Sequence, residues 1–237
     1  MRAEPRERLR TGERLEIAEV EASLALGLPV VHDAGGVLVL RKPAGLAVHR
    51  GPKLETSVAE LLERWAPGAG LAHRIDRGAS GLLLAGRDAE TMRRLARATE
   101  SGELRRAYLA VVTGDLAGDV TIDVGLRVLD EPMGNSPKVV PDEAGLPSIT
   151  HVRVVRRHGD RTTIEAKLET GRTHQIRAHL RAIGHPLLGD PRYGDADVNR
   201  RARETFGVAR PLLHSWTLAW SELALEASLE PDLARMA

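Results

Sequence analysis

The chain has 237 residues, of which 42% are hydrophobic and 28% charged. These are ordinary values for a folded globular protein, so a disordered chain is not expected. Cysteine is absent, which excludes disulfides and thiolate metal sites and suits a reducing cytosol. A charged N-terminus and the lack of a long apolar run favour a cytoplasmic protein with neither a signal peptide nor a membrane span.

The net charge is only +1, but positive charge is concentrated in the second half of the chain. Residues 151–181 contain eight Lys or Arg against three Asp or Glu. Such a segment favours a phosphate-bearing partner. The alternative is codon usage, because the chain has thirty Arg against only four Lys.

The first half of the chain predicts an extension, a strand and two helices. Residues 1–29 are polar and predict a helical or loose extension, and residues 36–42 predict a short apolar strand. Residues 57–65 predict a helix that begins with a capping box, Ser57 with Glu60. Residues 88–101 predict a second helix, with Asp88 as its N-cap and a glycine at its end.

In the second half the hydrophobic pattern changes to that of strands. A helix is expected from Thr173 to Gly184, with Ile176, Leu180 and Ile183 on one face. The expected strands are residues 104–113, 120–128, 149–157, 161–168 and 212–220. Strands outnumber helices and hairpin connections recur, so the predicted class is α+β, with a mostly antiparallel mixed sheet flanked by helices and loops.

Several common cofactor and metal motifs are absent. The chain has no GxxxxGK[ST], no GxGxxG and no HExxH. His174 and His179 are five residues apart and would point about 140° from each other on a helix. Metal binding is therefore not expected, although a metal-dependent nuclease built on this histidine-containing helix is one alternative function.

Four stretches remain, and together they are distinctive. They are VLRKPAGLAVHRG (residues 39–51), HRIDRGASGLLL (73–84), RRAYLAVVTG (105–114) and LETGRTHQIRAHLRAIGHPLLGDPRYG (168–194). In this order and spacing they resemble the pseudouridine synthases of the RluA family, which isomerise uridine within RNA. The late stretch LLHSWTL (212–218) is similar to the closing segment of that family. The resemblance covers about residues 30–220.

The resemblance implies the pseudouridine synthase catalytic fold for residues 30–237. The 29 residues before it are too few for the separate RNA-binding domain that many members of the family carry. The implied activity is the isomerisation of uridine to pseudouridine in ribosomal or transfer RNA by a monomer. No group is oxidised and none leaves permanently, so neither a cofactor nor a metal is demanded.

Asp76 is implied by the resemblance to be the catalytic aspartate, acting on the ribose beside the scissile bond. Two roles stay open, nucleophilic attack on the sugar and removal of a ribose proton. The structural alternative is an aspartate that caps a turn or pairs with Arg74 and Arg77. A buried carboxylate needs a cation to remain ionised, and Arg177 is implied as that partner. Its own alternatives are a phosphate contact or a charge on the helix surface.

Tyr108 and Arg74 are implied to contact the substrate. Tyr108 offers a ring on which uracil could stack, a contact worth about 1–3 kcal/mol per base. Its alternative is core packing, the usual role of an aromatic residue in a strand. Arg74 is expected beside the position that the base leaves, or on a phosphate. Ile176 is expected to pack the floor of the pocket.

Four residues are predicted RNA contacts: Lys42, His73, Arg172 and His174. For Lys42 and His73 a structural role is the alternative. Basic segments at residues 153–161 and 192–203 are further predicted to line the RNA track. One residue departs from the family pattern, Ala79, where the family usually has threonine. It is the only hint of the runner-up function, an RNA-binding paralogue without turnover.

Overall fold

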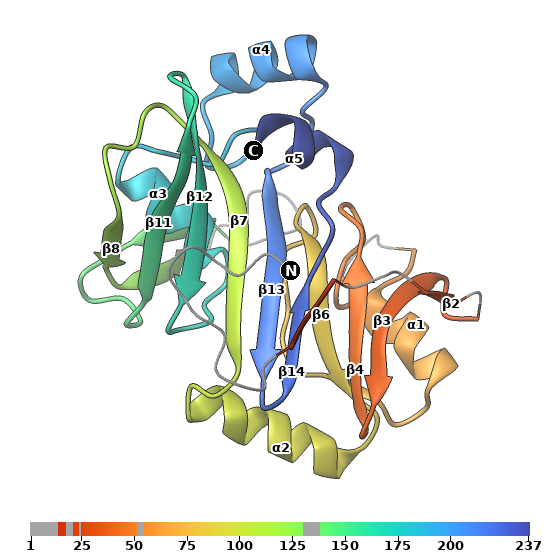
Figure 1. The fold of residues 1–237 in the computed structure, drawn as a ribbon. Helices are drawn as coiled ribbons and strands as arrows, with labels where there is room; N and C mark the ends of the chain where they lie inside the picture. Colours follow the sequence, from red (N-terminus) through yellow and green to blue (C-terminus); the bar gives the residue numbers. More distant parts are fainter. Residues whose placement is uncertain (1–13, 18–20, 24, 52–54, 130–137) are drawn as a thin grey trace. The chain divides into compact units, whose positions relative to one another are not determined.

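The computed structural model describes residues 14–17, 21–23, 25–51, 55–129 and 138–237 (Figure 1). The chain divides into two compact units. Unit 1 comprises Met1–Arg106 and Ser215–Leu229, and unit 2 comprises Ala107–His214 and Glu230–Ala237. Most residues of both units fall within residues 30–237, the range predicted to form one catalytic domain. That this range is a single domain stays a prediction.

Unit 1 is a mainly antiparallel sheet with two helices. Its strands are β1 (Arg14–Ile17), β2 (Glu21–Ser23), β3 (Leu28–Ala34), β4 (Val37–Lys42), β5 (Gly70–Leu71), β6 (Ser80–Gly86), β13 (Leu213–Trp220) and β14 (Leu223–Glu226). The strand order is β2-β3-β4-β6-β13, with β5 beside β6 and β14 beside β13. Strand β1 pairs with β14 in parallel, whereas the pairs β2–β3, β3–β4, β4–β6, β5–β6 and β13–β14 are antiparallel.

The core of unit 1 lies between the sheet and helix α2 (Ala89–Glu100). Helix α2 contributes Leu95 and Ala98, which pack with side chains from β4, β6, β13 and β14. Helix α1 (Val58–Trp65) lies between β4 and β5 in the chain, and its side chains Val58 and Leu62 are buried. Both helices are amphipathic, with one face buried, as expected for helices on the surface of a sheet.

Gly81 explains the glycine of HRIDRGASG. Its φ is +108°, and a Cβ added there would lie 2.2 Å from the carbonyl oxygen of Ser215. Only glycine tolerates such a close backbone approach in this conformation. The requirement fixes the start of β6 directly after the loop that carries Asp76.

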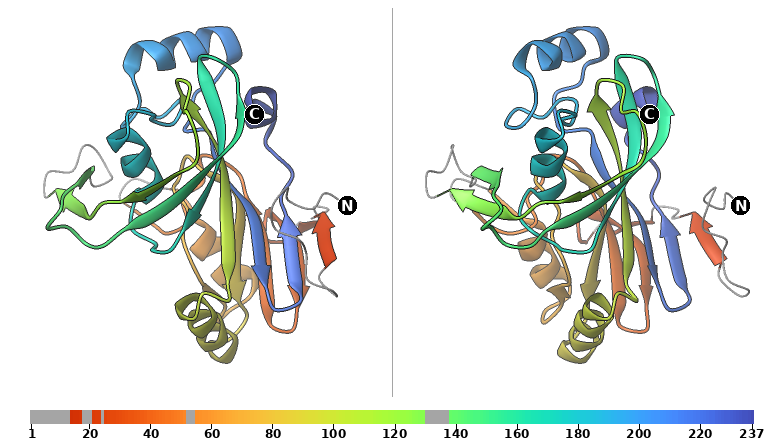
Figure 2. Two further views of the ribbon diagram at one scale, coloured as in Figure 1. Left: turned by 60° about the vertical axis from the view of Figure 1, so that its left-hand side comes forward. Right: turned by 90° about the vertical axis from the view of Figure 1, so that its left-hand side faces the viewer.

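Unit 2 contains a second group of antiparallel strands, ordered β7-β12-β11-β8. These are β7 (Arg105–Thr113), β8 (Val120–Asp123), β11 (Ile149–Arg157) and β12 (Arg161–Leu168). Strands β9 (Leu126–Leu129) and β10 (Lys138–Pro141) form a separate pair. The helices are α3 (Gln175–Ala182), α4 (Ala196–Phe206) and α5 (Pro231–Met236). Figure 2 shows α3 along one face of the β11–β12 hairpin.

The predicted α+β class with a mainly antiparallel sheet is confirmed. Both predicted helix starts in unit 1 are confirmed as well. Ser57 Oγ accepts the N–H of Glu60 at 3.3 Å, and Asp88 Oδ1 accepts the N–H of Thr91 at 2.7 Å. The strands expected at residues 149–157 and 161–168 have those bounds. Local capping and alternation were sufficient at these positions.

Four elements differ from what the sequence predicted. In the part of the extension that the structure describes, strands β1 and β2 take the place of a helix or loose chain, because β1 pairs with β14, about 200 residues away. Residues 1–13, 18–20 and 24 of the extension lie outside the described residues. The strand expected at residues 120–128 is broken at Gly125, where a Cβ would lie 2.5 Å from the carbonyl oxygen of Asp142. Helix α3 begins at Gln175, two residues later than expected, and helix α4 was not predicted.

Candidate active site

Asp76 occupies the first position of a four-residue turn between β5 and β6. The N–H of Ala79 donates to the carbonyl oxygen of Asp76 at 3.0 Å and closes the turn. Ile75 is 5% exposed and Ala79 is fully buried, whereas Asp76 is half-buried. The turn therefore fixes the backbone of Asp76 between two buried anchors and leaves part of the residue accessible to solvent.

The loop after β4 is hydrogen-bonded to this turn. The N–H of Gly45 donates to the carbonyl oxygen of Arg77 at 2.8 Å, and Arg77 Nε donates to the carbonyl oxygen of Gly45 at 2.8 Å. Gly45 has a φ of +90°, which favours glycine. The KPAG sequence of the first stretch thus supports the loop that carries Asp76.

Lys42 connects the same two loops from inside. Its Nζ donates to the carbonyl oxygens of Pro43 (2.9 Å), Leu46 (2.8 Å) and Arg77 (3.3 Å). The side chain is fully buried, and an ammonium group has three N–H donors. Of the two roles considered for Lys42, this arrangement favours the structural one over contact with RNA.

His73 fixes the opposite side of the Asp76 loop. Its Nε2 accepts the N–H of Leu84 at 3.0 Å, and the N–H of Ala72 donates to the carbonyl oxygen of Leu84 at 2.8 Å. Burial, assisted by the positive charge of Arg106, lowers the pKa of His73 to about 3. The ring is therefore neutral, with its proton on Nδ1, and protonation of Nε2 would break the bond to β6. This geometry also favours a structural role.

In unit 2, Tyr108 lies on the face of the sheet that packs against α3. Tyr108 pairs across strands with Ala166, and Ala166 pairs with Val152. Thr150, two residues before Val152, shares this face and hydrogen-bonds to α3. Tyr108 is 5% exposed. Its position agrees both with a rigid platform for a base and with the packing alternative.

Helix α3 is attached to the sheet by a chain of side-chain hydrogen bonds. Gln175 Nε2 donates to Thr150 Oγ1 at 3.1 Å, and Thr150 Oγ1 lies 2.9 Å from His179 Nδ1. His179 Nε2 lies 2.9 Å from the carbonyl oxygen of Val124, which can only accept. His179 therefore carries its proton on Nε2, and Nδ1 accepts from the threonine hydroxyl. Burial lowers the pKa of His179, which keeps this ring neutral.

Arg177 projects from α3 and forms a two-point ion pair with Asp190. Its Nε donates to Oδ2 at 2.7 Å, and its Nη2 donates to Oδ1 at 2.9 Å. The ring of Tyr193 lies 4.9 Å from the guanidinium carbon. Arg177 is 8% exposed and Asp190 is fully buried. The alternative of a charge on the helix surface is therefore excluded by its burial.

The charge of Asp190 is maintained by several donors. Burial alone would raise the pKa of Asp190, but the hydrogen bonds and charge of Arg177 outweigh it. The backbone N–H groups of Arg192 and Tyr193 also donate to Oδ1, at 2.9 and 3.1 Å. The net result is a pKa below the ordinary value, so Asp190 is ionised at neutral pH.

His174 and Ile176 are more buried than an RNA-contact surface requires. His174 is 7% exposed, and its Nδ1 lies 3.1 Å from the hydroxyl of Tyr193. It has left-handed backbone geometry, with φ 52°, at the N-cap of α3. Ile176 is 4% exposed, and its place in the floor of a pocket stays a prediction. Arg172 is exposed and is the member of this group best placed to contact RNA.

The predicted site residues are divided between the units. Asp76, Arg74, Lys42 and His73 belong to unit 1 and Tyr108, Arg172, His174, Ile176 and Arg177 belong to unit 2. The expected meeting of Asp76 with Arg177 and Tyr108 therefore stays a prediction. Asp190 and Tyr193 were not singled out, although both lie in the GDPRYG end of the fourth stretch. The only sequence signal for these two residues was that an acidic and an aromatic residue lie beside glycines.

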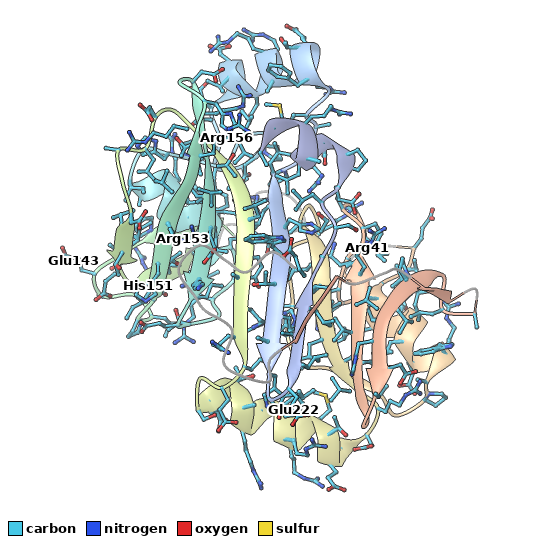
Figure 3. All side chains as sticks on the ribbon, viewed as in Figure 1. Arg41, Glu143, His151, Arg153, Arg156 and Glu222 are labelled. Atoms are coloured by element: carbon cyan, nitrogen blue, oxygen red, sulfur yellow. The ribbon has the colours of Figure 1, made fainter. Side chains whose placement is uncertain are left out.

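Two arginines of the RNA track proposed at residues 153–161 lie on the face of the sheet opposite Tyr108, and the rest of the track stays a prediction. Arg153 pairs across strands with Glu165, and Glu165 pairs with Leu109, the neighbour of Tyr108. Side chains alternate along a strand, so Arg153 lies on the face opposite Tyr108. Arg153 also forms an ion pair with buried Glu165. Figure 3 shows Arg153 and Arg156 along β11. An RNA bound at the Tyr108 face would not reach these side chains.

The histidines of α3 give no support to the nuclease alternative. His174 contacts Tyr193, and His179 is engaged by Thr150 and Val124. Among the residues that the structure describes, no three His, Asp or Glu side chains converge as metal ligands would. Over the same residues, no helix has the length and apolarity needed to cross a bilayer.

Comparison with known proteins connects this geometry to one family. The family model described as RNA pseudouridylate synthase matches residues 36–182. The ribosomal large subunit pseudouridine synthase D of Nitrosomonas europaea is 34% identical over 230 residues, 90% of this chain and 65% of the relative. The synthase D of Xanthomonas campestris is 35% identical over 259 residues, 99% of this chain and 77% of the relative. The chain thus spans about two thirds to three quarters of the length of these relatives.

Solved structures show the same fold. The structure titled human RNA pseudouridylate synthase domain containing 4 matches with a TM-score of 0.71 at 18% identity, covering 87% of this chain and 90% of the other. At that identity the likeness concerns the fold. It agrees with the sheet and helix arrangement of the two units.

Proposed function

The chain belongs to the RNA pseudouridylate synthase family, and on this premise we propose that it isomerises uridine to pseudouridine in RNA. The reaction breaks the bond between ribose C1′ and uracil N1 and forms a bond between C1′ and C5. The C5 hydrogen leaves as a proton and N1 gains one. The atoms of substrate and product are the same, so the reaction needs acid, base and positioning groups.

Asp76 is proposed as the catalytic carboxylate. Its half-buried position at the start of a tight turn supports this role. It acts either by attack on the ribose or by removal of a ribose proton. The proposal places Arg177 beside the carboxylate to keep it ionised, and Tyr108 beneath the loosened base. Arg74, exposed in the same loop, would contact the space that the base leaves or a phosphate.

One observation carries the proposal: the Asp76 turn is fixed by side chains from the first and second motif stretches. Lys42 uses a fully buried ammonium group to bind three backbone carbonyls, one of them that of Arg77. His73 holds a buried neutral ring against β6. A charged group buried in this way is costly, so its use argues that the position of this loop matters.

Large-subunit ribosomal RNA is the proposed substrate, because the relatives from Nitrosomonas and Xanthomonas are named for it. The target uridine must leave its stack to reach a carboxylate, which costs a few kcal/mol. Exposed Arg172 would offset part of that cost by contacting phosphate. We further propose that the protein acts as a cytoplasmic monomer.

Tritium release tests the function. Transcripts of large-subunit ribosomal RNA and of transfer RNA carry tritium at uracil C5, and replacement of that hydrogen frees the label into water. Wild type is expected to release it from ribosomal RNA, and Asp76→Asn to release it about 10³-fold or more slowly. Asp88→Asn is the matched control, since asparagine caps a helix as well as aspartate, and it should equal wild type.

Three results would each contradict part of the proposal. Release that persists in Asp76→Asn would exclude this carboxylate as the catalytic group. RNA binding by wild type without release from either RNA would support the RNA-binding paralogue. Release from transfer RNA alone would overturn the ribosomal substrate and leave the isomerase activity in place.

A further inference from the structure

Arg177 is held by a second carboxylate, and the structure gives that residue a function. We propose that Asp190 is a positioning residue: it holds the Arg177 guanidinium in the plane and position that catalysis requires. The inference deepens the proposed function and rests on it. It concerns contacts within unit 2 alone, between residues 13 positions apart.

The two-point geometry determines an orientation as well as an attraction. Asp190 Oδ2 accepts from Nε at 2.7 Å, and Oδ1 accepts from Nη2 at 2.9 Å. Two parallel bonds between planar groups fix the guanidinium plane, which a single contact would leave free to turn. Asp190 accepts from two of the five N–H groups of Arg177, so the other N–H groups keep a fixed direction.

Asp190 is itself immobilised by backbone donors. Its Oδ1 accepts the N–H groups of Arg192 and Tyr193, at 2.9 and 3.1 Å. Asn199 Nδ2 donates to the carbonyl oxygen of Asp190 at 2.8 Å, and Asn199 Oδ1 accepts the N–H of Gly189 at 2.8 Å. Asp190 is fully buried. The carboxylate is thus held by two backbone donors, and Asn199 holds the backbone of the same loop. Together they make Asp190 a rigid support for Arg177.

The glycines on either side of Asp190 permit this enclosure. Gly189 has a φ of +79°, and a Cβ there would lie 2.1 Å from the carbonyl oxygen of Arg210. At Gly194 a Cβ would lie 2.5 Å from the carbonyl oxygen of Asp190. The GDPRYG sequence is therefore explained as a loop that folds tightly around one carboxylate.

Tyr193 limits Arg177 from a second direction. Its ring lies 4.9 Å from the guanidinium carbon, a cation–π contact. The ring is in turn fixed by its hydroxyl, which accepts the N–H of Val139 at 3.0 Å and lies 3.1 Å from His174 Nδ1. Arg177 is thus set between a fixed carboxylate and a fixed ring.

Stability alone is a weak explanation for the pair. A buried ion pair commonly contributes little more than apolar residues of the same volume, because both charges lose water. The chain also contains a matched example: Arg210 Nε and Nη2 donate to Asp232 Oδ2 and Oδ1 at 2.7 and 2.6 Å. That pair has the same geometry in the same unit but involves no predicted site residue, so it serves as the control.

The test compares Asp190→Asn with Asp232→Asn in the full chain. Turnover and KM are measured by tritium release from labelled ribosomal RNA, and melting temperature by circular dichroism. Asp190→Asn is expected to lower kcat about 100-fold with KM changed less than about 3-fold, because a displaced guanidinium affects the reacting geometry. Asp232→Asn should lower the melting temperature by less, because the Asp232 side chain is 22% exposed and that of Asp190 is fully buried, and should keep kcat within about 3-fold of wild type.

Equal loss of kcat in the two variants would overturn the positioning role, since it would show a general effect of lost stability. Should Asp190→Asn fail to fold, Asp190→Glu preserves the charge and moves the carboxylate by one methylene. A kcat about 10-fold below wild type in that variant supports the proposal, and an unchanged kcat overturns it. Wild type that releases no tritium contradicts the proposed function instead.

Discussion

The loop that carries Asp76 and the helix that carries Arg177 are fixed in different ways. In unit 1 the side chains of Lys42, Arg77 and His73 bond to backbone atoms of nearby loops and strands. In unit 2 Arg177 is fixed by other side chains, those of Asp190 and Tyr193. The first arrangement sets where a backbone runs, and the second sets which way one charged group points.

This difference separates two kinds of damage. Removing a group that binds backbone carbonyls should cost stability first, and activity as a consequence. Removing a group that orients a side chain should cost turnover out of proportion to stability. The variants below test the first kind and the location of the RNA, and the Asp190 variants described above test the second.

Lys42→Met should give the largest loss of stability. Methionine fits the volume but leaves three carbonyl oxygens without the donor that Lys42 supplies. The free energy of unfolding should fall by about 3 kcal/mol, and tritium release should fall with it. Urea denaturation measures the first quantity. Lys138→Met, at an exposed lysine of β10, is the control. An unfolding midpoint equal to that of wild type would contradict the structural role assigned to Lys42.

The His73 ring should give an effect that is absent at neutral pH and grows as the pH falls. Its pKa is about 3 in the folded chain, against an ordinary value of 6.5 for histidine. Above pH 6.5 the ring is neutral in both states and its contribution is complete. As the pH falls from 6.5 towards 3, the unfolded chain binds a proton that the folded chain does not. Stability is then lost at up to about 1.4 kcal/mol per pH unit.

Urea denaturation at several pH values between 7 and 4 checks this prediction. His73→Gln removes the titrating group, so its stability should fall less steeply with acid than that of wild type. His49→Gln changes an exposed histidine and should keep the wild-type slope. Parallel curves for wild type and His73→Gln would contradict the assigned buried, neutral ring.

The smallest expected effect concerns the two faces of the unit 2 sheet. Arg172→Gln should weaken RNA binding and reduce the slope of log K against log salt by about one. Arg156→Gln should change neither, because Arg156 pairs with Thr163 on the face opposite Tyr108. Fluorescence polarisation over a salt series measures both. Equal effects at the two arginines would place Arg156 in contact with the RNA and contradict the assignment of the RNA to the Tyr108 face.

Much of the fold was predictable because its signals are local. Ser57 and Asp88 are followed by the donors that they cap, and β11 and β12 alternate within one hairpin. Strand β1 was not predictable, because its partner β14 is about 200 residues away. Helix α4 did have local signals, since Asp195 caps it and Gly207 ends it with a φ of +73°.

The candidate site was predictable to the extent that motif residues identify it. Asp76, Tyr108 and Arg177 were singled out, and Lys42 and His73 were named with a structural role as one alternative. Asp190 and Tyr193, which hold Arg177, were not singled out. The pairing of Arg177 with Asp190 depends on how the loop after α3 turns back, which no periodicity in the sequence reveals. The burial of Lys42 was equally hidden, because a lysine is ordinarily exposed.

The most direct test maps pseudouridine across cellular RNA in three strains: one with the gene, one without it, and one that carries only the Asp76→Asn variant. The account predicts at least one large-subunit ribosomal site modified in the first strain and unmodified in the other two. Identical maps in all three strains, or a site restored by Asp76→Asn, would contradict it.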